Sequence, residues 1–155
     1  MQNRKIILLE AAPEKKIVLT PEFSNRVSAL STTSVELLTN IGAWDRMLDA
    51  RVSPVMKMRV WDGCSKAGIL FGEDDNSGEI EPLSYLVEND VTVSALTDVI
   101  RECDNLEVKY GARVKKYNLP VKEATESRPK EEVVVELEDG ERIETSLLVG
   151  ADGFR

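Results

Sequence analysis

Histidine is absent from the 155 residues of this chain. Imidazole is the usual partner in Ser-His and Cys-His couples, a common metal ligand, and the side chain that titrates near neutrality. The chain can therefore supply none of these, and acid–base chemistry would have to come from carboxylates, lysine, tyrosine, cysteine or a cofactor. Cysteine is also scarce: Cys64 and Cys103 lie far apart without a CxxC spacing. They indicate neither a disulfide framework nor a zinc knuckle, and we expect two buried or idle thiols in a reducing compartment.

Positive charge and long apolar runs are also limited. Asp and Glu number 28 against 20 Lys and Arg, a net charge of -8. Nonspecific binding to nucleic acid or to an anionic membrane surface needs clustered cations, so neither is expected. No apolar run approaches the roughly 20 residues that span a bilayer, and the start lacks the apolar stretch and cleavage site of a signal peptide.

Two short apolar runs lie near the ends of the chain. Residues 6–10 read IILLE, and residues 147–153 read LLVGADG. An apolar run without alternation is typical of a strand covered on both faces in a parallel sheet. We therefore predict an α/β fold with a buried strand at each of these places. Strands of this kind need neighbours, which favours a chain that represents part of a larger sheet.

Between these runs the pattern predicts helices and hairpins. Ser31 or Thr32 can cap a helix that Gly42 ends, and a second short helix follows from Trp44. A third helix begins after a cap at Asn89 or Asp90. Its expected inner face is Val93, Leu96 and Ile100.

Alternating residues predict the strands. Residues 55–71 form a hairpin that turns at Asp62-Gly63, and residues 132–145 form another that turns at residues 138–140. Residues 106–110 and 114–119 read as strands, and residues 17–19 as a brief strand within a loop. The segments 72–81 and 120–130 read as loops; the acidic one lacks the glycine and final glutamate of a calcium-binding EF-hand.

Three side chains stand out as candidates for binding. Ligands bind at the carboxyl ends of strands in open parallel sheets, and Glu10 ends the first strand, where a carboxylate can accept hydrogen bonds from ribose hydroxyls. Asp152 lies among small residues that allow close approach of a ligand. Arg26 precedes a predicted helix and could pair with a phosphate or a flat ring system. The alternatives are an exposed strand end for Glu10, an ordinary turn for Asp152 and a surface ion pair for Arg26.

Several segments together resemble the flavin monooxygenases of ubiquinone biosynthesis, which are class A aromatic hydroxylases. The resemblance covers nearly the whole chain and rests on residues 6–11, 24–28 (SNRVS), 41–45 (IGAWD), 60–62, 87–91 (VENDV) and 148–153. The segments around Asn25-Arg26 and Gly42-Ala43 are fairly specific. The Gly-Ala-Asp-Gly element is shared by many flavoprotein hydroxylases.

The resemblance implies an incomplete FAD/NAD(P)-binding Rossmann-like domain with a β-hairpin from the substrate-side sheet. Residues 1–50 and 90–155 would be parts of the FAD-binding domain, and residues 51–89 the hairpin region. FAD would be the cofactor: Glu10 would bind its ribose, Arg26 would lie near the flavin, and Asp152 with Gly153 would lie at the pyrophosphate. Asn89 occupies a position where many relatives carry an arginine that contacts FAD.

The implied reaction is the hydroxylation, with dioxygen, of the aromatic ring of a polyprenylated precursor of ubiquinone. The flavin carries the oxygen chemistry, which fits a chain without histidine. The resemblance leaves a ferredoxin-type protein and NAD(P)H open as the electron donor. It implies a mitochondrial location on the matrix side of the inner membrane, peripheral membrane association and other coenzyme Q proteins as partners.

One feature of the family is missing from the sequence. Relatives carry a Gly-x-Gly-x-x-Gly loop whose following helix binds the pyrophosphate, and no such motif precedes the first predicted strand. We therefore expect this chain to represent part of a larger enzyme and to bind FAD poorly by itself. The alternative is a noncatalytic module that assembles with other coenzyme Q proteins.

Overall fold

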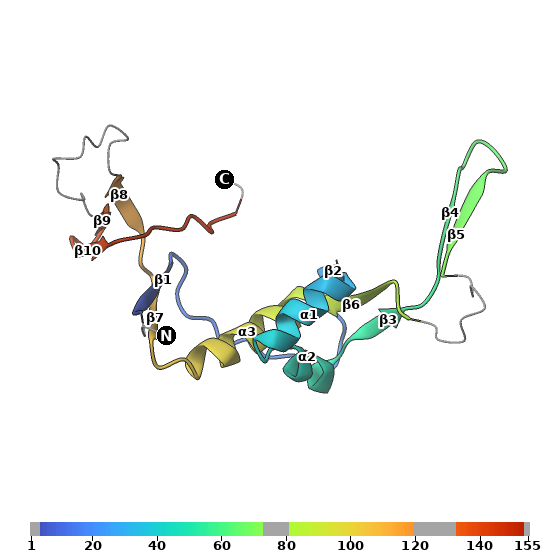
Figure 1. Cartoon of the computed structure of the whole chain (residues 1–155), viewed down its shortest axis with the longest axis horizontal. Coiled ribbons are helices and arrows are strands. Elements are labelled where there is room, and N and C mark those ends of the chain that lie inside the picture. Colours follow the sequence, from blue (N-terminus) through green and yellow to red (C-terminus); the bar gives the residue numbers. More distant parts are fainter. Residues whose placement is uncertain (1–3, 73–80, 120–132, 154–155) are drawn as a thin grey trace. The chain divides into compact units, whose positions relative to one another are not determined.

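The computed structural model describes residues 4–72, 81–119 and 133–153. The chain divides into two compact units, one made of residues 1–15 and 105–155 and the other of residues 16–104 (Figure 1). The predicted loops at 72–81 and 120–130 lie almost entirely outside the described residues. The α/β class is confirmed, since helices and both parallel and antiparallel strand pairs are present.

The first unit contains a parallel pair and a three-stranded antiparallel sheet. Strand β1 (Ile6–Glu10) pairs in parallel with β7 (Leu106–Tyr110), so that Glu10 lies opposite Tyr110. Strands β8 (Val114–Asn118), β9 (Val133–Leu137) and β10 (Arg142–Thr145) form the antiparallel sheet, with β9 in the centre. The alternation of β9 buries one face, and the core of this unit consists of Val133, Val135 and Leu137.

The second unit packs helices against a small antiparallel sheet. Strand β6 (Ser84–Glu88) lies between β2 (Val27–Leu30) and β3 (Ser53–Val55). Three helices accompany it: α1 (Thr32–Asn40), α2 (Trp44–Ala50) and α3 (Asn89–Arg101). Their apolar faces meet in one core, whose buried members are Leu38, Ala43, Trp44, Met47, Val87, Val91 and Ala95. This core fixes the junction of β6 and α3, where the candidate residue Asn89 lies.

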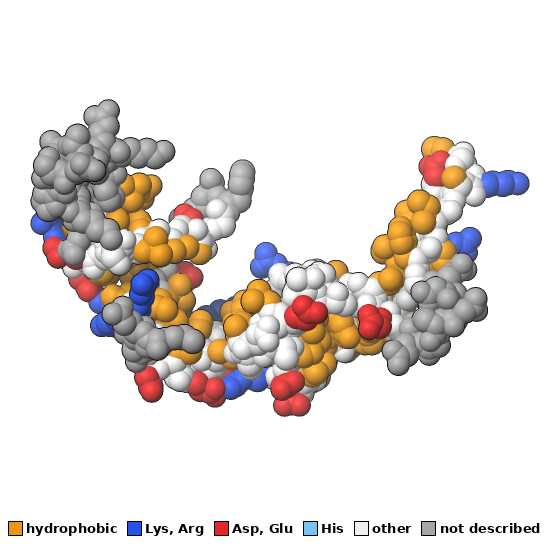
Figure 2. Space-filling model, in the orientation of Figure 1, with side chains coloured by type: hydrophobic (Ala, Val, Ile, Leu, Met, Phe, Trp, Pro, Cys, Tyr) orange, Lys and Arg blue, Asp and Glu red, His pale blue; other side chains and the backbone are white. Residues whose placement is uncertain are grey.

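The hairpin predicted at 55–71 is confirmed. Strand β4 (Met58–Trp61) pairs antiparallel with β5 (Gly68–Phe71) around the turn at Asp62. All eight strand residues are exposed. Figure 2 shows hydrophobic side chains gathered along this hairpin.

Local signals located α1 and α2 correctly. The Ser31 side chain accepts a hydrogen bond from the Ser34 N–H at the start of α1. Gly42 follows the end of α1 with a φ of 76°, a conformation that glycine adopts without steric strain. The turn at residues 138–140 is also confirmed, and Gly140 has a φ of 91°.

Two strands were expected to be covered on both faces, and both predictions are wrong. Residues 6–10 form a strand with one open face, and residues 147–150 form no strand. One face of β1 is open, with Ile6 50% and Leu8 41% exposed, because the parallel pair is covered on its other face only. Residues 147–150 form no strand, and Leu147 and Val149 are exposed. Only Leu148 packs against the core of the first unit. An apolar run shows that a segment can be buried; it does not show that a covering layer is present.

Smaller predictions also fail. Residues 17–19 form no strand, and Arg26 precedes strand β2 rather than a helix. The cap residue of α3 is Glu88, which makes no side-chain cap bond, so neither Asn89 nor Asp90 is the cap. The predicted inner face of α3 is correct in part: Leu96 packs against the core, but the buried residues are Val91 and Ala95, and Val93 is 50% exposed. The helix begins at Asn89, which is earlier than a cap at Asn89 or Asp90 predicts.

Both cysteines are free and exposed, which agrees with idle rather than buried thiols. Within the described residues, no helix combines the length and the apolar character needed to cross a membrane.

Candidate functional site

The candidate residues lie in both units. Glu10, Asp152 and Gly153 belong to the first unit, and Arg26 and Asn89 to the second. Each group is described by itself.

Arg26 and Asn89 are neighbours although 63 positions separate them in the sequence. Strands β2 and β6 pair antiparallel, with Val27 opposite Glu88. Arg26 and Asn89 are the next residues outward on the two strands, and the Asn89 N–H donates to the Arg26 carbonyl at 2.9 Å. The sheet therefore brings together two residues that the sequence analysis had assigned to the flavin separately.

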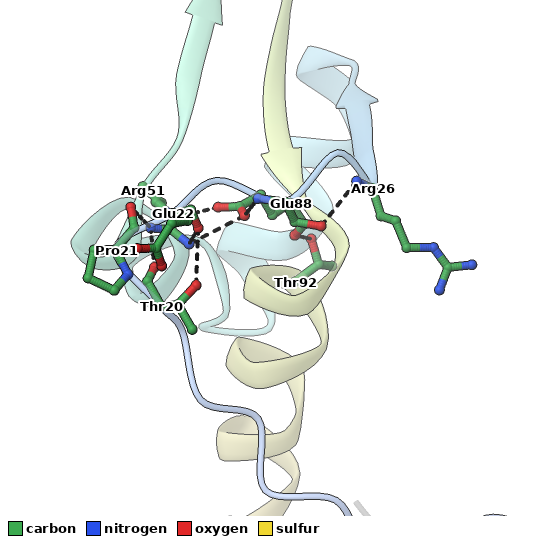
Figure 3. A network of polar contacts seen from close by, with 8 residues as sticks. Thr20, Pro21, Glu22, Arg26, Arg51, Glu88 and Thr92 are labelled. Carbon is green, nitrogen blue, oxygen red and sulfur yellow. Dashed lines mark hydrogen bonds and ion pairs between the residues drawn. The ribbon is translucent and has the colours of Figure 1, made fainter.

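The side chains of this pair are partly free to meet a ligand. Oδ1 of Asn89 accepts a hydrogen bond from the Ser28 hydroxyl at 2.8 Å. With its oxygen occupied in this way, the amide can offer its NH₂ donors to another acceptor. The Arg26 side chain is exposed and extends away from the neighbouring polar network (Figure 3). Together the two side chains can present hydrogen-bond donors and one positive charge, which suits a ligand with anionic or carbonyl oxygens.

An ion pair between the buried Glu88 and the partly buried Arg51 lies directly beside them, and the sequence analysis does not predict it. Glu88, the residue before Asn89, is 6% exposed and is the one buried charged residue among those the structure describes. Its carboxylate accepts hydrogen bonds from the Ser24 N–H and from Nε and Nη2 of Arg51. The pKa of Glu88 is lowered by the Ser24 N–H and by Arg51, against the opposing effect of burial. The carboxylate is therefore held ionised in the interior of this unit.

The guanidinium of Arg51 also binds the segment before Arg26. Nη1 donates to the Thr20 carbonyl at 2.7 Å, and Nη2 donates to the Glu22 carbonyl at 3.3 Å. The same group lies over the ring of Phe23, 5.0 Å from its centre, in a cation–π contact. Figure 3 shows the hydrogen bonds and the ion pair of this network, which join residues 20–24 to the end of α2 and the end of β6.

A weak sequence signal for this ion pair exists. Glu88 ends the run SYLVE and starts a helix, and a charged residue at the end of an otherwise apolar strand needs a partner if it is buried. Its partners, Ser24 and Arg51, are 64 and 37 residues away. Only the folded sheet shows that these residues meet.

Glu10 lies at the carboxyl end of β1, as predicted. Its Oε1 accepts a hydrogen bond from the Ala12 N–H at 2.7 Å, which folds the chain sharply after the strand. Its own carbonyl accepts from the Ala112 N–H at 3.0 Å. The carboxylate is exposed and has lone pairs left for hydroxyl groups, so it is suited to a ribose.

Asp152 and Gly153 lie in an irregular, exposed segment. Gly153 has a φ of 71°, which is unfavourable for residues with a side chain. Oδ1 of Asp152 lies 3.9 Å from the place where a Cβ on Gly150 would be. The segment is a tight turn of small residues around one carboxylate. Within the described residues, no hydrogen bond or ion pair joins Asp152 to Glu10.

Other features of the described residues contain none of the candidates. No group of three or more Cys, Asp or Glu side chains within residues 4–72, 81–119 and 133–153 is arranged to hold a metal ion. A hollow of about 250 Å³ on the antiparallel sheet of the first unit is lined by Lys116, Asn118, Val134, Glu136, Arg142 and Glu144. Two of its lining residues, Glu136 and Arg142, form an ion pair at 3.6 Å, and Glu136 also contacts Lys115 outside the hollow.

No protein-family model matches the chain. Among curated proteins, it is 41% identical over 155 residues to the mitochondrial ubiquinone biosynthesis monooxygenase COQ6 of Xenopus tropicalis. It is 43% identical over 156 residues to the protein of the same name in Danio rerio and 39% identical over 154 residues to that of Homo sapiens. These matches cover 97–99% of this chain but only 31–32% of the relatives. The chain thus spans about a third of the length of the curated relatives it matches.

Solved structures share the fold at low sequence identity. The native FqzB structure matches with a TM-score of 0.65 and 17% identity, over 96% of this chain and 30% of that one. HpxO of Klebsiella pneumoniae, complexed with FAD and uric acid, matches with a TM-score of 0.59 and 16% identity, over 98% of this chain and 40% of that one. The mixed α/β fold of the chain is therefore shared with part of each of these proteins. In sequence, the chain is a homologue of the mitochondrial ubiquinone biosynthesis monooxygenases named COQ6 and matches about a third of their length.

Proposed function

We propose that this chain forms part of an FAD-dependent monooxygenase that hydroxylates the aromatic ring of a polyprenylated precursor of ubiquinone. The observation that carries the proposal is the 41% identity to a ubiquinone biosynthesis monooxygenase over 99% of the chain. The matched region includes every candidate residue. The fold shared with flavin monooxygenase structures supports the same reading.

The residues of the second unit fit a flavin. The Arg26 guanidinium and the Asn89 amide offer donors from adjacent positions at the end of the β2–β6 pair. The flavin ring carries carbonyl oxygens and ring nitrogens, which accept such hydrogen bonds. In this role the two residues orient the ring, and FAD when bound supplies the oxygen chemistry that the chain itself lacks.

The residues of the first unit fit the remainder of the cofactor. The exposed Glu10 carboxylate at the end of a parallel strand can accept hydrogen bonds from ribose hydroxyls. The small residues around Asp152 and Gly153 let the backbone approach the pyrophosphate closely. Asp152 and a pyrophosphate are both negatively charged and repel each other. Asp152 would therefore act through neighbouring N–H groups or water rather than by direct contact.

The β4–β5 hairpin offers an apolar face for the substrate. The register places Met58 opposite Phe71 and Val60 opposite Ile69, so that these four side chains share one face. Each of the four is between 42% and 60% exposed. We assign this face to the polyprenylated substrate, because its prenyl chain is apolar.

The names of the relatives indicate the cellular setting. They are called mitochondrial, and we propose a mitochondrial location for this chain, at the matrix side of the inner membrane as a peripheral protein. Other coenzyme Q proteins are the proposed partners, and either a ferredoxin-type protein or NAD(P)H the electron donor. Residues 1–50 and 90–155 are assigned to the FAD-binding domain and residues 51–89 to the substrate-side hairpin region.

A chimera tests the proposal, because the chain matches one segment of longer relatives. The matched segment of the Danio rerio protein would be replaced by these 155 residues. We expect the purified chimera to carry FAD and to support ubiquinone synthesis in cells that lack their own enzyme. A chimera that folds but contains no flavin would contradict the proposal. Arg26→Ala should lower the FAD content, while Arg59→Ala, an exposed arginine of the hairpin, serves as its control.

A further inference from the structure

The buried ion pair between Glu88 and Arg51 calls for an explanation beyond stability. Replacing a buried ion pair by well-packed apolar side chains is often neutral or stabilising, so such a pair is weak evidence of a stabilising role. An ion pair does, however, fix directions that an apolar contact leaves free. The groups that these two residues bind are therefore informative.

The partners of the pair lead to the two candidate flavin residues. Glu88 is covalently joined to Asn89, and its carboxylate accepts the N–H of Ser24. The Ser24 hydroxyl in turn accepts the Arg26 N–H at 3.1 Å. The Glu88 carboxylate thus belongs to the residue before Asn89. It is linked to Arg26 by hydrogen bonds through one intermediate residue, Ser24.

Arg51 completes the restraint from the other side. Its guanidinium binds both carboxylate oxygens of Glu88 and reaches the carbonyls of Thr20 and Glu22. With the Pro21 carbonyl at 3.4 Å from Nη1, this planar group spans five acceptors, which a lysine ammonium cannot match in geometry. Residues 20–24 have no regular secondary structure, so these bonds and the contact with Phe23 hold the segment in place.

We propose that Glu88 and Arg51 are positioning residues that hold Arg26 and Asn89 at the spacing needed to bind the flavin. The inference rests on the proposed function, since it takes the Arg26–Asn89 pair as a flavin contact. Neither Glu88 nor Arg51 touches the cofactor in this assignment. They act through Ser24 and through the peptide bond to Asn89.

The test compares two ion pairs of the same unit. Glu88→Gln and Arg51→Lys change the positioning pair. Glu102→Gln and Arg46→Lys change the exposed pair at 2.7 Å between α2 and the end of α3. Leu38→Ala serves as a third control, because it destabilises the same core without touching residues 20–26 or 89.

Two measurements are made on each variant. In the isolated chain, amide NMR signals of Ser24, Arg26 and Asn89 report the local geometry. In the chimera, the FAD dissociation constant and the visible circular dichroism of the bound flavin report the consequence. We expect Glu88→Gln and Arg51→Lys to weaken FAD binding about tenfold or more, as loss of outer partners does at other sites. The circular dichroism of the bound flavin should change as well. The FAD dissociation constants of the control variants should stay within about twofold of the wild-type value.

The outcomes separate the two proposals. Wild-type FAD affinity and flavin spectrum in Glu88→Gln would overturn the positioning role and leave the proposed function standing. The positioning role would also fail if Leu38→Ala weakened FAD binding as much at equal loss of stability. A folded wild-type chimera without flavin would defeat the proposed function itself. Unchanged Arg26 and Asn89 signals in the isolated Glu88→Gln chain would then defeat the local restraint as well.

Discussion

The Ser28 hydroxyl donates a hydrogen bond of 2.8 Å to Oδ1 of Asn89, across 61 positions of the sequence. The bond joins β2 to the first residue of α3, and it determines which end of the Asn89 amide remains available. With Oδ1 occupied, the amide nitrogen Nδ2 remains available as a hydrogen-bond donor. An arginine at this position would also present donors, so the two residue types can perform the same task.

Ser28→Ala should free the Asn89 amide without unfolding the chain. The lost hydrogen bond is exposed, so we expect the free energy of unfolding to fall by about 0.5–1 kcal/mol at most. The side-chain amide signals of Asn89 should move toward those of a mobile asparagine in NMR spectra. Ser65→Ala removes a hydroxyl from the β4–β5 turn and is the control. Unchanged Asn89 signals in Ser28→Ala would show that the hydroxyl does not orient the amide.

Acidification should weaken the second unit through Glu88. The Ser24 N–H and Arg51 hold the pKa of this carboxyl below its ordinary value of 4.5. A group whose pKa is lower in the folded than in the unfolded chain stabilises the fold above the unfolded-state pKa. That contribution is lost as the pH falls through the folded-state pKa.

The pH dependence can be assigned by comparing Glu88→Gln with wild type. Urea unfolding between pH 7 and pH 3 should show a stability difference between the two that shrinks below about pH 4.5, as Glu88 becomes protonated. Glu107 and Glu136 in the first unit also have lowered pKa values, because they hydrogen-bond with Lys5 and Lys115 respectively. Their titration gives both proteins a common slope. A difference that stays constant over the whole range would contradict the assignment to Glu88.

Two adjacent leucines test the core of the second unit. Leu38 is 9% exposed and packs in the core, whereas Leu37 is 62% exposed on the same helix. Leu38→Ala should lower the free energy of unfolding by roughly 2–5 kcal/mol. Leu37→Ala should change it by about 0.5 kcal/mol or less, because it leaves no cavity and alanine is a strong helix former. Equal losses in urea unfolding would show that α1 does not pack as described.

Much of the local structure could be predicted because its signals are local. Ser31 and Gly42 bound α1 by their own side-chain and backbone preferences, and alternation located β4 and β5. The wrong predictions concern which faces of an apolar segment are covered by other parts of the chain. Residues 6–10 and 147–150 are equally apolar, yet one segment pairs in a sheet with an open face and the other forms no strand. Whether an apolar residue becomes buried depends on other segments, which the run itself does not encode.

The candidate site also combines residues that the sequence identifies with contacts that only the folded structure shows. Arg26 and Asn89 were named one at a time, and their contact follows from the antiparallel register of β2 and β6. The sequence indicates only that Glu88 needs a partner if it is buried; it does not indicate that Ser24 and Arg51 are those partners. Arg51 follows a short helix and reads as an ordinary surface cation. Its role depends on a carboxylate 37 positions away and on carbonyls that any residue types would provide.

Gly72 ends the β4–β5 hairpin in a conformation that restricts it to glycine. Its φ is 78°, and a Cβ added there would lie 2.1 Å from the Met56 carbonyl oxygen. Gly72→Ala therefore combines two penalties. The left-handed conformation alone costs about 1–2 kcal/mol for a residue with a side chain, and the contact with the backbone of Met56 forces a shift in addition. We expect a lower free energy of unfolding together with displaced amide signals of Met58 and Phe71.

Two other glycines separate these penalties. Gly140 has a φ of 91° but open space around its Cβ position, so Gly140→Ala measures the conformational penalty in another turn. Gly63, in the hairpin turn, has open space and no positive φ, so Gly63→Ala should be nearly neutral. The loss of stability should therefore follow the order Gly72→Ala, Gly140→Ala, Gly63→Ala. If Gly72→Ala proved as mild as Gly63→Ala, residues 56 and 72 would not approach each other, and the base of the proposed substrate hairpin would differ from the structure.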